Sequence, residues 1–147
     1  MTGNKTYFDT ALFIYALELK MKAARDLFLN ALQNGTIGTS TITIMEYTTG
    51  CFKYGTQEDI DRFNKFLRDL MFEIKSADRE VAVEAAKIRS QYPSFKQMDS
   101  LQIACAKVSG ASVFYTNDKQ LLQYQNDKLK VLKMEADSFY NKEQGDC

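Results

Sequence analysis

Short runs of β-forming residues alternate with longer stretches of helical apolar spacing, and the alternation begins near the start of the chain. Thr6, Tyr7 and Phe8 favour a strand and carry no charge, and Asp9 ends the run. From about Thr10 the apolar residues recur at a spacing that suits a helix better than a strand. The pattern therefore predicts a buried strand, a turn at Asp9 and a helix that follows the turn.

The same alternation continues along the rest of the chain. Asn34-Gly35 and Tyr92-Pro93 separate later segments, because glycine ends helices and the residue before proline disfavours the α region. The later predicted strands cover 36–39, 71–75, 111–116 and 129–132. A further helix begins at a cap formed by Ser40 or Thr43 and ends near Tyr54. The other later predicted helices cover 21–33, 57–69, 78–91, 98–109 and a short stretch at 119–124.

Strands that alternate with helices predict an α/β fold. We expect a three-layer α/β/α sandwich with a central parallel sheet of about five strands, joined by right-handed crossovers. The 147 residues, 45% of them hydrophobic, predict a single domain over 1–147. A chain of this size buries roughly 68–70% of its unfolded surface, enough for a substantial core. The stretch after about residue 136 is mostly polar, and we expect a loose tail there.

Composition narrows the chemistry that the chain can perform. The 19 basic and 19 acidic residues balance, so a polyanionic partner needs a local patch or a bound cation. The chain has no histidine, which excludes histidine bases, Ser-His and Cys-His pairs and histidine zinc ligands. Cys51, Cys105 and Cys147 show no paired metal spacing, and we expect the first two to be core residues. Catalysis would therefore use carboxylates, lysines, hydroxyls or a hard metal ion.

The compartment is predicted from two further features of the chain. An odd number of cysteines without a signal peptide is typical of a cytoplasmic protein. No apolar run approaches the ~20 residues that a membrane-spanning helix needs, so we expect no membrane segment.

Four acidic residues occupy comparable places in the predicted fold. Asp9 follows the first strand, and Asp118 follows the fourth. Glu46 lies early in the helix after the second strand, and Asp99 opens the helix that leads into the fourth. The first and fourth strands should be neighbours where the winding of the sheet reverses, which is where open α/β sheets bind ligands. We therefore expect the four carboxylates to converge at the carboxyl edge of the sheet.

Helix capping is the alternative interpretation of each acid. Asp9, Asp99 and Asp118 could each cap a helix, because a short carboxylate accepts from the free amides of the first turn. Thr43 and Glu46 have the spacing of a capping box. Any one of these acids taken singly is more often a cap than a ligand. Capping alone does not explain why all four are predicted at one edge of the sheet.

A shared acidic site would need a cation. Two carboxylates ~4 Å apart repel by about 4 kcal/mol at an effective dielectric near 20. Oxygen-only ligands suit Mg2+ or Mn2+, which share their remaining coordination with water and phosphate. Such an ion supports hydrolysis of a phosphodiester.

Four segments, in their order along the chain, resemble the four motifs of PIN domains. The segments are Tyr7–Tyr15, Thr39–Glu46, Met98–Ala106 and Tyr115–Asp118. The resemblance covers residues 7 to about 132. It implies a metal-dependent ribonuclease with a parallel sheet between helices. Small single-domain members resemble VapC-type toxins of bacterial and archaeal toxin–antitoxin pairs.

The resemblance also implies roles for individual residues. The catalytic residues and ligands of Mg2+ or Mn2+ would be Asp9, Glu46, Asp99 and Asp118, supported by Thr10, Thr116 and Asn117. The chain departs from the family at two positions. Ala11 stands where many relatives have serine or asparagine, and Lys96 is the nearest basic residue where relatives often have arginine shortly before the third acid.

The expected function is that of an endoribonuclease toxin. Its implied partners are an RNA substrate, an antitoxin protein and a second copy of the chain in a homodimer. The main alternative is a non-catalytic PIN-like module that binds protein or RNA. A phosphoacceptor domain that uses Asp9 is a second alternative, but it would need a lysine on a late strand and a tighter acidic cluster.

Overall fold

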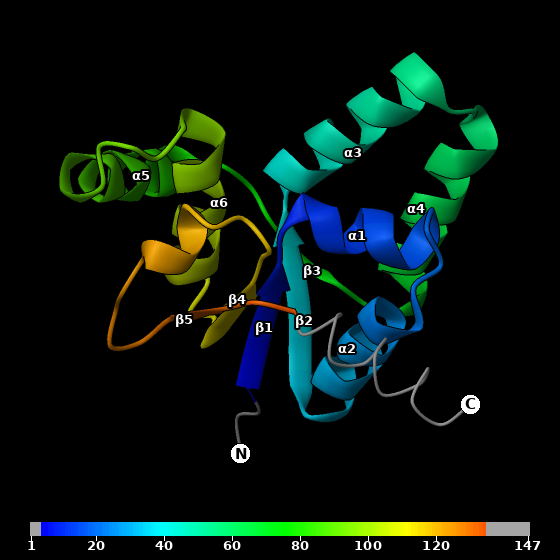
Figure 1. Cartoon of the computed structure of the whole chain (residues 1–147), viewed down its shortest axis with the longest axis horizontal. Coiled ribbons are helices and arrows are strands. Elements are labelled where there is room, and N and C mark those ends of the chain that lie inside the picture. Colours follow the sequence, from blue (N-terminus) through cyan, green and yellow to red (C-terminus); the bar gives the residue numbers. More distant parts are fainter. Residues whose placement is uncertain (1–3, 135–147) are drawn as a thin grey trace.

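The computed structural model describes residues 4–134 and shows a wholly parallel five-stranded sheet with helices on both faces (Figure 1). The strands are β1 (Asn4–Phe8), β2 (Gly35–Ser40), β3 (Glu73–Lys75), β4 (Val113–Tyr115) and β5 (Lys130–Leu132). The α-helices are α1 (Thr10–Leu17), α2 (Lys22–Gln33), α3 (Thr41–Tyr54), α4 (Gln57–Asp69), α5 (Arg79–Gln91) and α6 (Gln97–Val108). The predicted α/β/α sandwich is confirmed. The tail expected after about residue 136 lies outside the described residues.

The sheet reverses its winding at β1. The strand order is β3-β2-β1-β4-β5, so the chain builds one side of β1 first and the other side afterwards. Phe8 pairs with Tyr115 in the β1–β4 register, and the amide of Asp9 donates to the carbonyl oxygen of Tyr115 at 2.9 Å. The prediction that the first and fourth strands are neighbours is confirmed. Their carboxyl ends form the switch point at which open α/β sheets bind ligands.

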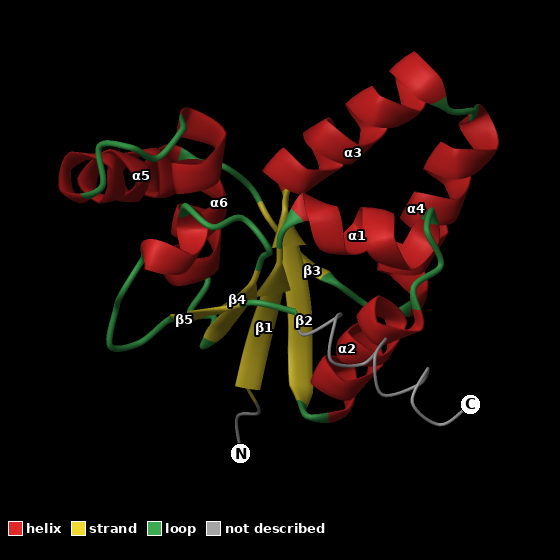
Figure 2. Ribbon diagram, in the orientation of Figure 1, coloured by secondary structure: helices red, strands yellow, loops and turns green. Residues whose placement is uncertain are grey.

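The two faces of the sheet carry separate cores. Tyr7 and Phe8 are successive strand residues and point to opposite faces. Tyr7 packs in a core with α5 and α6, whereas Phe8 packs in a core with α1, α2, α3 and α4. Figure 2 shows these two groups of helices on either side of the strands. Cys51 and Cys105 are free and buried in these cores, as predicted, and Cys147 lies outside the described residues.

Gly38 in β2 leaves room for the ring of Tyr7, its neighbour in β1. A Cβ atom at Gly38 would lie 2.3 Å from Cε1 of Tyr7, which is fully buried. The Tyr7 hydroxyl oxygen lies 2.8 Å from Glu73 Oε1 and 2.8 Å from Ser109 Oγ. The Tyr7 side chain therefore joins the centre of the sheet to β3 and to the end of α6.

Two predicted elements are shorter in the structure. The strand expected at 71–75 begins at Glu73, because Met71 follows α4 in the left-handed region with φ of 56°. The helix expected at 119–124 is a single 3-10 turn, Leu121–Gln123. The Asp118 side chain accepts from the amide of Gln120 at 2.9 Å, so a local turn takes the place of the first helical turn. Between residues 4 and 134, no helix has the length and apolar character that crossing a bilayer requires.

Candidate functional site

Asp9 lies at the switch point and is held from two sides. It is the N-cap of α1, and its Oδ1 accepts from the amide of Thr10 at 2.7 Å. Its Oδ2 accepts from the hydroxyl of Thr116, also at 2.7 Å. Thr116 is fully buried directly after β4. The two hydrogen bonds fix the carboxylate between the carboxyl ends of β1 and β4.

Glu46 reaches the same place from the second turn of α3. Its Oε1 accepts from the hydroxyl of Thr10 at 2.6 Å. Thr10 is itself buried, and its amide binds Asp9. Thr10 therefore contacts both the first and the second candidate acid, Asp9 through its amide and Glu46 through its hydroxyl.

Asp99 and Asp118 approach from α6 and from the loop after β4. Asp99 is half-buried in the first turn of α6, and Asp118 is exposed. The amide of Asp118 donates to the hydroxyl of Thr116 at 3.0 Å, so Thr116 contacts both Asp118 and Asp9. The four acids thus come from four separate segments, as the sequence predicts.

Neighbouring carboxylates contribute to the pKa values of two of the four acids, Asp9 and Asp99. Burial raises the pKa of Asp9 to about 6, and the charges of Glu46 and Asp99 add to this effect. Burial also raises the pKa of Asp99, and the charges of Asp118 and Glu46 contribute, while Lys96 acts in the opposite direction. Each acid therefore lies within electrostatic reach of another. Neighbouring carboxyl groups with raised pKa values are typical of functional sites.

The donor set fits a hard divalent cation in its chemistry. All four groups offer oxygen, the ligand atom that Mg2+ and Mn2+ prefer. A cation would also offset the mutual repulsion that helps to raise the pKa of Asp9. Among residues 4–134, no three cysteine, aspartate or glutamate side chains form a group that could hold a metal ion. Hydrogen bonds from Thr10 and Thr116 fix the orientation of Asp9 and Glu46, and each accepting oxygen keeps a lone pair with which it could bind a cation.

The capping interpretation is correct for one acid. Asp9 caps α1, but the N-cap position of α6 is Lys96 rather than Asp99. Ser40 caps α3, so Thr43 and Glu46 do not form a capping box. Asp99 still accepts a hydrogen bond from the backbone of Lys96 at the start of α6, whereas for Glu46 another reason is needed to explain an acid at this edge of the sheet.

The three supporting residues have different surroundings. Thr10 and Thr116 contact the acids directly, as described above. The Oδ1 of Asn117 accepts from the amide of Met134 at 3.0 Å. Asn117 therefore binds the segment that follows β5 rather than one of the carboxylates.

Sequence analysis missed a buried polar group beside the acids. Gln102 is 3% exposed, and its Nε2 lies 2.8 Å from Thr43 Oγ1 and 3.2 Å from Thr10 Oγ1. Its Oε1 accepts from the hydroxyl of Ser40 at 2.8 Å. A usable signal was present in the sequence, because Gln102 is three residues after Asp99 and so lies on the same face of α6.

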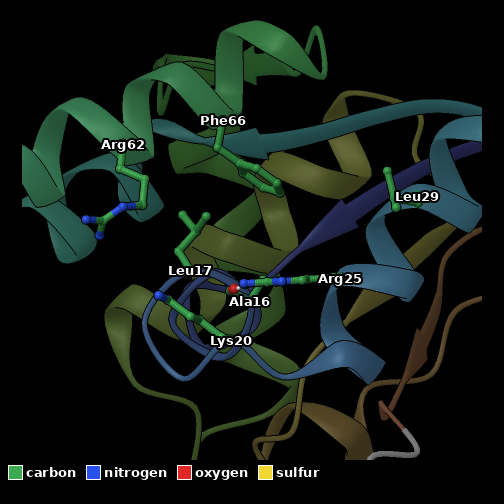
Figure 3. A pocket seen from close by; sticks show the side chains of 7 residues that line it. All are labelled: Ala16, Leu17, Lys20, Arg25, Leu29, Arg62 and Phe66. Carbon is green, nitrogen blue, oxygen red and sulfur yellow. Dashed lines mark hydrogen bonds between the residues drawn. The ribbon is translucent and has the colours of Figure 1, made fainter.

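One cavity adjoins the candidate site, and a second lies away from it. One of about 250 Å³ opens beside Glu46, between α1 and α3, and Gly50 lines it. The other, of about 410 Å³, lies among α1, α2 and α4 and contains none of the four acids (Figure 3). Its lining residues combine an apolar floor with three cations: Ala16, Leu17, Lys20, Arg25, Leu29, Arg62 and Phe66.

Three solved structures named as VapBC have a fold similar to that of this chain. VapBC2 from Rickettsia felis, bound to a promoter DNA fragment, matches with 18% identity and a TM-score of 0.75 over 88% of this chain and 98% of that chain. DNA-bound VapBC from Salmonella typhimurium matches with 20% identity and a TM-score of 0.72 over 89% and 98%. VapBC-1 from nontypeable Haemophilus influenzae matches with 17% identity and a TM-score of 0.72 over 88% and 98%. At these identities, the similarity shows the fold.

The length of the match to a family model shows which family the chain belongs to. No curated protein sequence matches the chain. The model of the PIN domain matches residues 6–127, a range that begins in β1 and includes all four candidate acids. The match covers well over half of the sequence, and the chain therefore belongs to the PIN domain family.

Proposed function

We propose that the chain is a metal-dependent endoribonuclease and the toxin of a toxin–antitoxin pair. Asp9, Glu46, Asp99 and Asp118 are the proposed ligands of Mg2+ or Mn2+ and form the catalytic site. The observation that carries the proposal is the environment of Asp9, whose pKa is raised by burial and by two neighbouring carboxylates at the switch point of the sheet. Repulsion of this kind is maintained in a fold where a cation offsets it.

The residues of the site have distinct tasks in this proposal. When bound, the cation supplies Lewis-acid polarisation of the scissile phosphate. Thr10 and Thr116 hold Asp9 and Glu46 in place, so the carboxylates are oriented before RNA arrives. The chain has no histidine, and we propose that one of the four carboxylates orients the attacking water.

The cavity beside Glu46 offers room for the substrate. Its volume is about 250 Å³, and Glu46, one of the proposed ligands, lines it. A Cβ atom at Gly50 would have no heavy atom within 4 Å, so the backbone of α3 is open on this side. Glu18 and Asp59 also line the cavity and no lysine or arginine does, so we propose that RNA lies along this part of α3 only when the cation bound beside Glu46 offsets the negative charge.

An antitoxin partner is supported by the names of the similar structures. These include VapBC complexes from Rickettsia felis and Salmonella typhimurium, both bound to DNA. The cavity in Figure 3 gives such a partner a surface on this chain, because Phe66 and Leu17 form an apolar floor between Lys20, Arg25 and Arg62. A segment that combines acidic and apolar side chains would complement this surface. A homodimer and a cytoplasmic location also belong to this proposal.

The Asp99→Asn variant tests the catalytic proposal. Asp99 is not the N-cap of α6 and its pKa is raised by burial and by neighbouring carboxylates, so the change should not lower the melting temperature. It should reduce Mn2+-dependent cleavage of mixed cellular RNA to the level seen with chelator, because an amide replaces a ligand carboxylate. The matched control is Asp61→Asn, the same change at an exposed position on α4, which should cleave like wild type. Full activity in Asp99→Asn would refute the assignment.

The non-catalytic PIN-like module is kept as a second candidate because of one observation. In the part of the chain described, the acids do not form a ready-made metal group. A binding module would show no Mn2+ binding by titration and no cleavage, yet would still retain RNA or a protein partner. Saturable Mn2+ binding that Asp99→Asn weakens would exclude this alternative.

A further inference from the structure

The amide of Gln102 is buried where α1, α3 and α6 meet the sheet. Its oxygen accepts from Ser40 at 2.8 Å, and its nitrogen lies near Thr43, Thr10 and Glu46, the last at 3.5 Å from Oε1. A buried polar side chain is costly unless it is paired, and here both ends of the amide are paired. The arrangement is therefore a built network rather than an accident of packing.

The chemistry of the neighbours determines which way the amide points. A carboxylate accepts hydrogen bonds and donates none. If the amide were reversed, its oxygen would face Glu46 Oε1, and two acceptors would repel each other. The Ser40 hydroxyl accepts from the amide of Thr43 and so has its own proton available for the Gln102 oxygen. Both neighbours favour the same orientation.

The orientation of Gln102 then determines the direction of every hydroxyl proton between Ser40 and Glu46. The Gln102 nitrogen donates to Thr43 and Thr10, so both hydroxyl oxygens act as acceptors. Thr10 has one proton and gives it to Glu46 at 2.6 Å. The Thr43 hydroxyl, 3.1 Å from that of Thr10, must therefore donate to it. The result is a one-way chain of donors that ends at one oxygen of Glu46.

We propose that Gln102 is a positioning residue that presents Glu46 to the metal, an inference that rests on the proposed function. The network occupies Oε1 of Glu46 and does not involve Oε2, which stays available as a ligand atom. Gln102 and Asp99 share one face of α6, so the same amide sets the place of Glu46 relative to Asp99. Hydrogen bonds that orient ligand groups typically change metal affinity 10- to 100-fold when they are removed.

The test is a double-mutant cycle read out by Mn2+ affinity. Gln102→Met keeps the length of the side chain and removes the amide. The variant should bind Mn2+ about 10-fold more weakly than wild type, measured by titration of free Mn2+. In the Glu46→Gln background, Gln102→Met should cause little further loss, because Gln102 acts through Glu46. A purely structural role would weaken binding equally in both backgrounds or in neither, and either result would overturn the proposal.

Ile103→Val is the matched control. Ile103 is the next residue of α6, is fully buried and packs in the core with α5 on the other side of the helix. This change should lower the melting temperature of the metal-free protein and leave Mn2+ affinity unchanged. If it weakens Mn2+ binding as much as Gln102→Met does, general loosening of α6 explains the effect and the proposal fails.

Further results distinguish a failure of folding, a failure of the proposed function and a failure of the role given to Gln102. If Gln102→Met does not fold, Thr43→Val takes its place in the cycle, because it keeps the shape of the side chain, removes the hydroxyl that links Gln102 to Thr10 and leaves the Ser40 cap intact. Thr43→Val should also lose Mn2+ affinity in the wild-type background and not beside Glu46→Gln, and an equal loss in both backgrounds would overturn the proposal. If wild type binds no Mn2+, the proposed function fails and this inference fails with it. Normal wild-type binding that neither variant changes would refute only the role of Gln102.

Discussion

The Asp9→Asn variant should make the metal-free protein more stable at pH 8. Burial, together with Glu46 and Asp99, raises the pKa of Asp9 from its ordinary value of 3.8 to about 6. A shift of about two units corresponds to about 3 kcal/mol by which the ionised carboxylate destabilises the folded state above both pKa values. Removing the charge removes this destabilisation.

The replacement amide recovers most of the local hydrogen bonds but not all of their strength. Its oxygen can accept from the amide of Thr10, and its nitrogen can donate to Thr116, where the carboxylate accepted from both. Neutral hydrogen bonds are weaker than those to a carboxylate, a loss of about 1 kcal/mol. The expected net gain at pH 8 is therefore about 2 kcal/mol, or about 4–8 °C in melting temperature for a chain of this size.

The dependence on pH identifies the cause. A group whose pKa is raised on folding contributes stability below its unfolded pKa, and this contribution is lost as the pH rises through the folded pKa. The stability of wild type should accordingly fall between about pH 4 and pH 6, and that of Asp9→Asn should fall less. At pH 4 the advantage of Asp9→Asn should vanish, because the carboxyl is then largely protonated in the folded state.

The assay is thermal or urea unfolding in chelator at pH 8 and pH 4, repeated at pH 8 with Mn2+. Added Mn2+ should stabilise wild type and not Asp9→Asn, because a ligand that binds only the folded state raises its stability. An Asp9→Asn protein that is less stable than wild type at pH 8 in chelator would contradict the electrostatic reasoning. An advantage that stays constant from pH 4 to pH 8 would also contradict it.

Three substitutions elsewhere test the packing. Gly50→Ala should stabilise the protein by about 0.8–1 kcal/mol, because glycine is unfavourable within a helix and a Cβ there meets open space; a fall in melting temperature would disprove this. Gly38→Ala should destabilise by about 1–3 kcal/mol in urea unfolding, because the new methyl would lie 2.3 Å from the Tyr7 ring, and a neutral result would show that the ring can move. Phe63→Ala should cost about 3–5 kcal/mol in the same assay, because its buried ring stacks on Tyr47 at 4.2 Å; a loss below 1 kcal/mol would mean that the site collapses freely.

The order of the elements could be predicted because local patterns report it, and the general topology of α/β sheets then placed β4 beside β1. Apolar runs and turn residues predicted the strands, and the alternation with helices implied parallel crossovers. The helix at 57–69 has the predicted bounds, because its start and its end are both marked locally. Thr56 and Asp59 form a capping box at the first end, and the chain turns through Met71 after the second.

The contacts of the acids were less predictable. Glu46 and Thr43 have the spacing of a capping box, but Ser40 caps the helix and both side chains turn to α1 and α6 instead. Local spacing shows which partners are near in sequence and says nothing of a competing partner brought by another segment. Asn117 likewise bonds to Met134, a contact across 17 positions that no local pattern reports.

The sequence by itself determined the class of fold, the position of each acid in its segment and the exclusion of histidine chemistry, because these depend on residue type and on short-range periodicity. Only the tertiary structure decided which hydroxyls hold Asp9 and Glu46, and that a buried amide from α6 lies among them. A polar residue in a helical pattern has the same appearance whether it faces water or the core. Its partners are settled when distant segments pack together and each buried donor must find an acceptor.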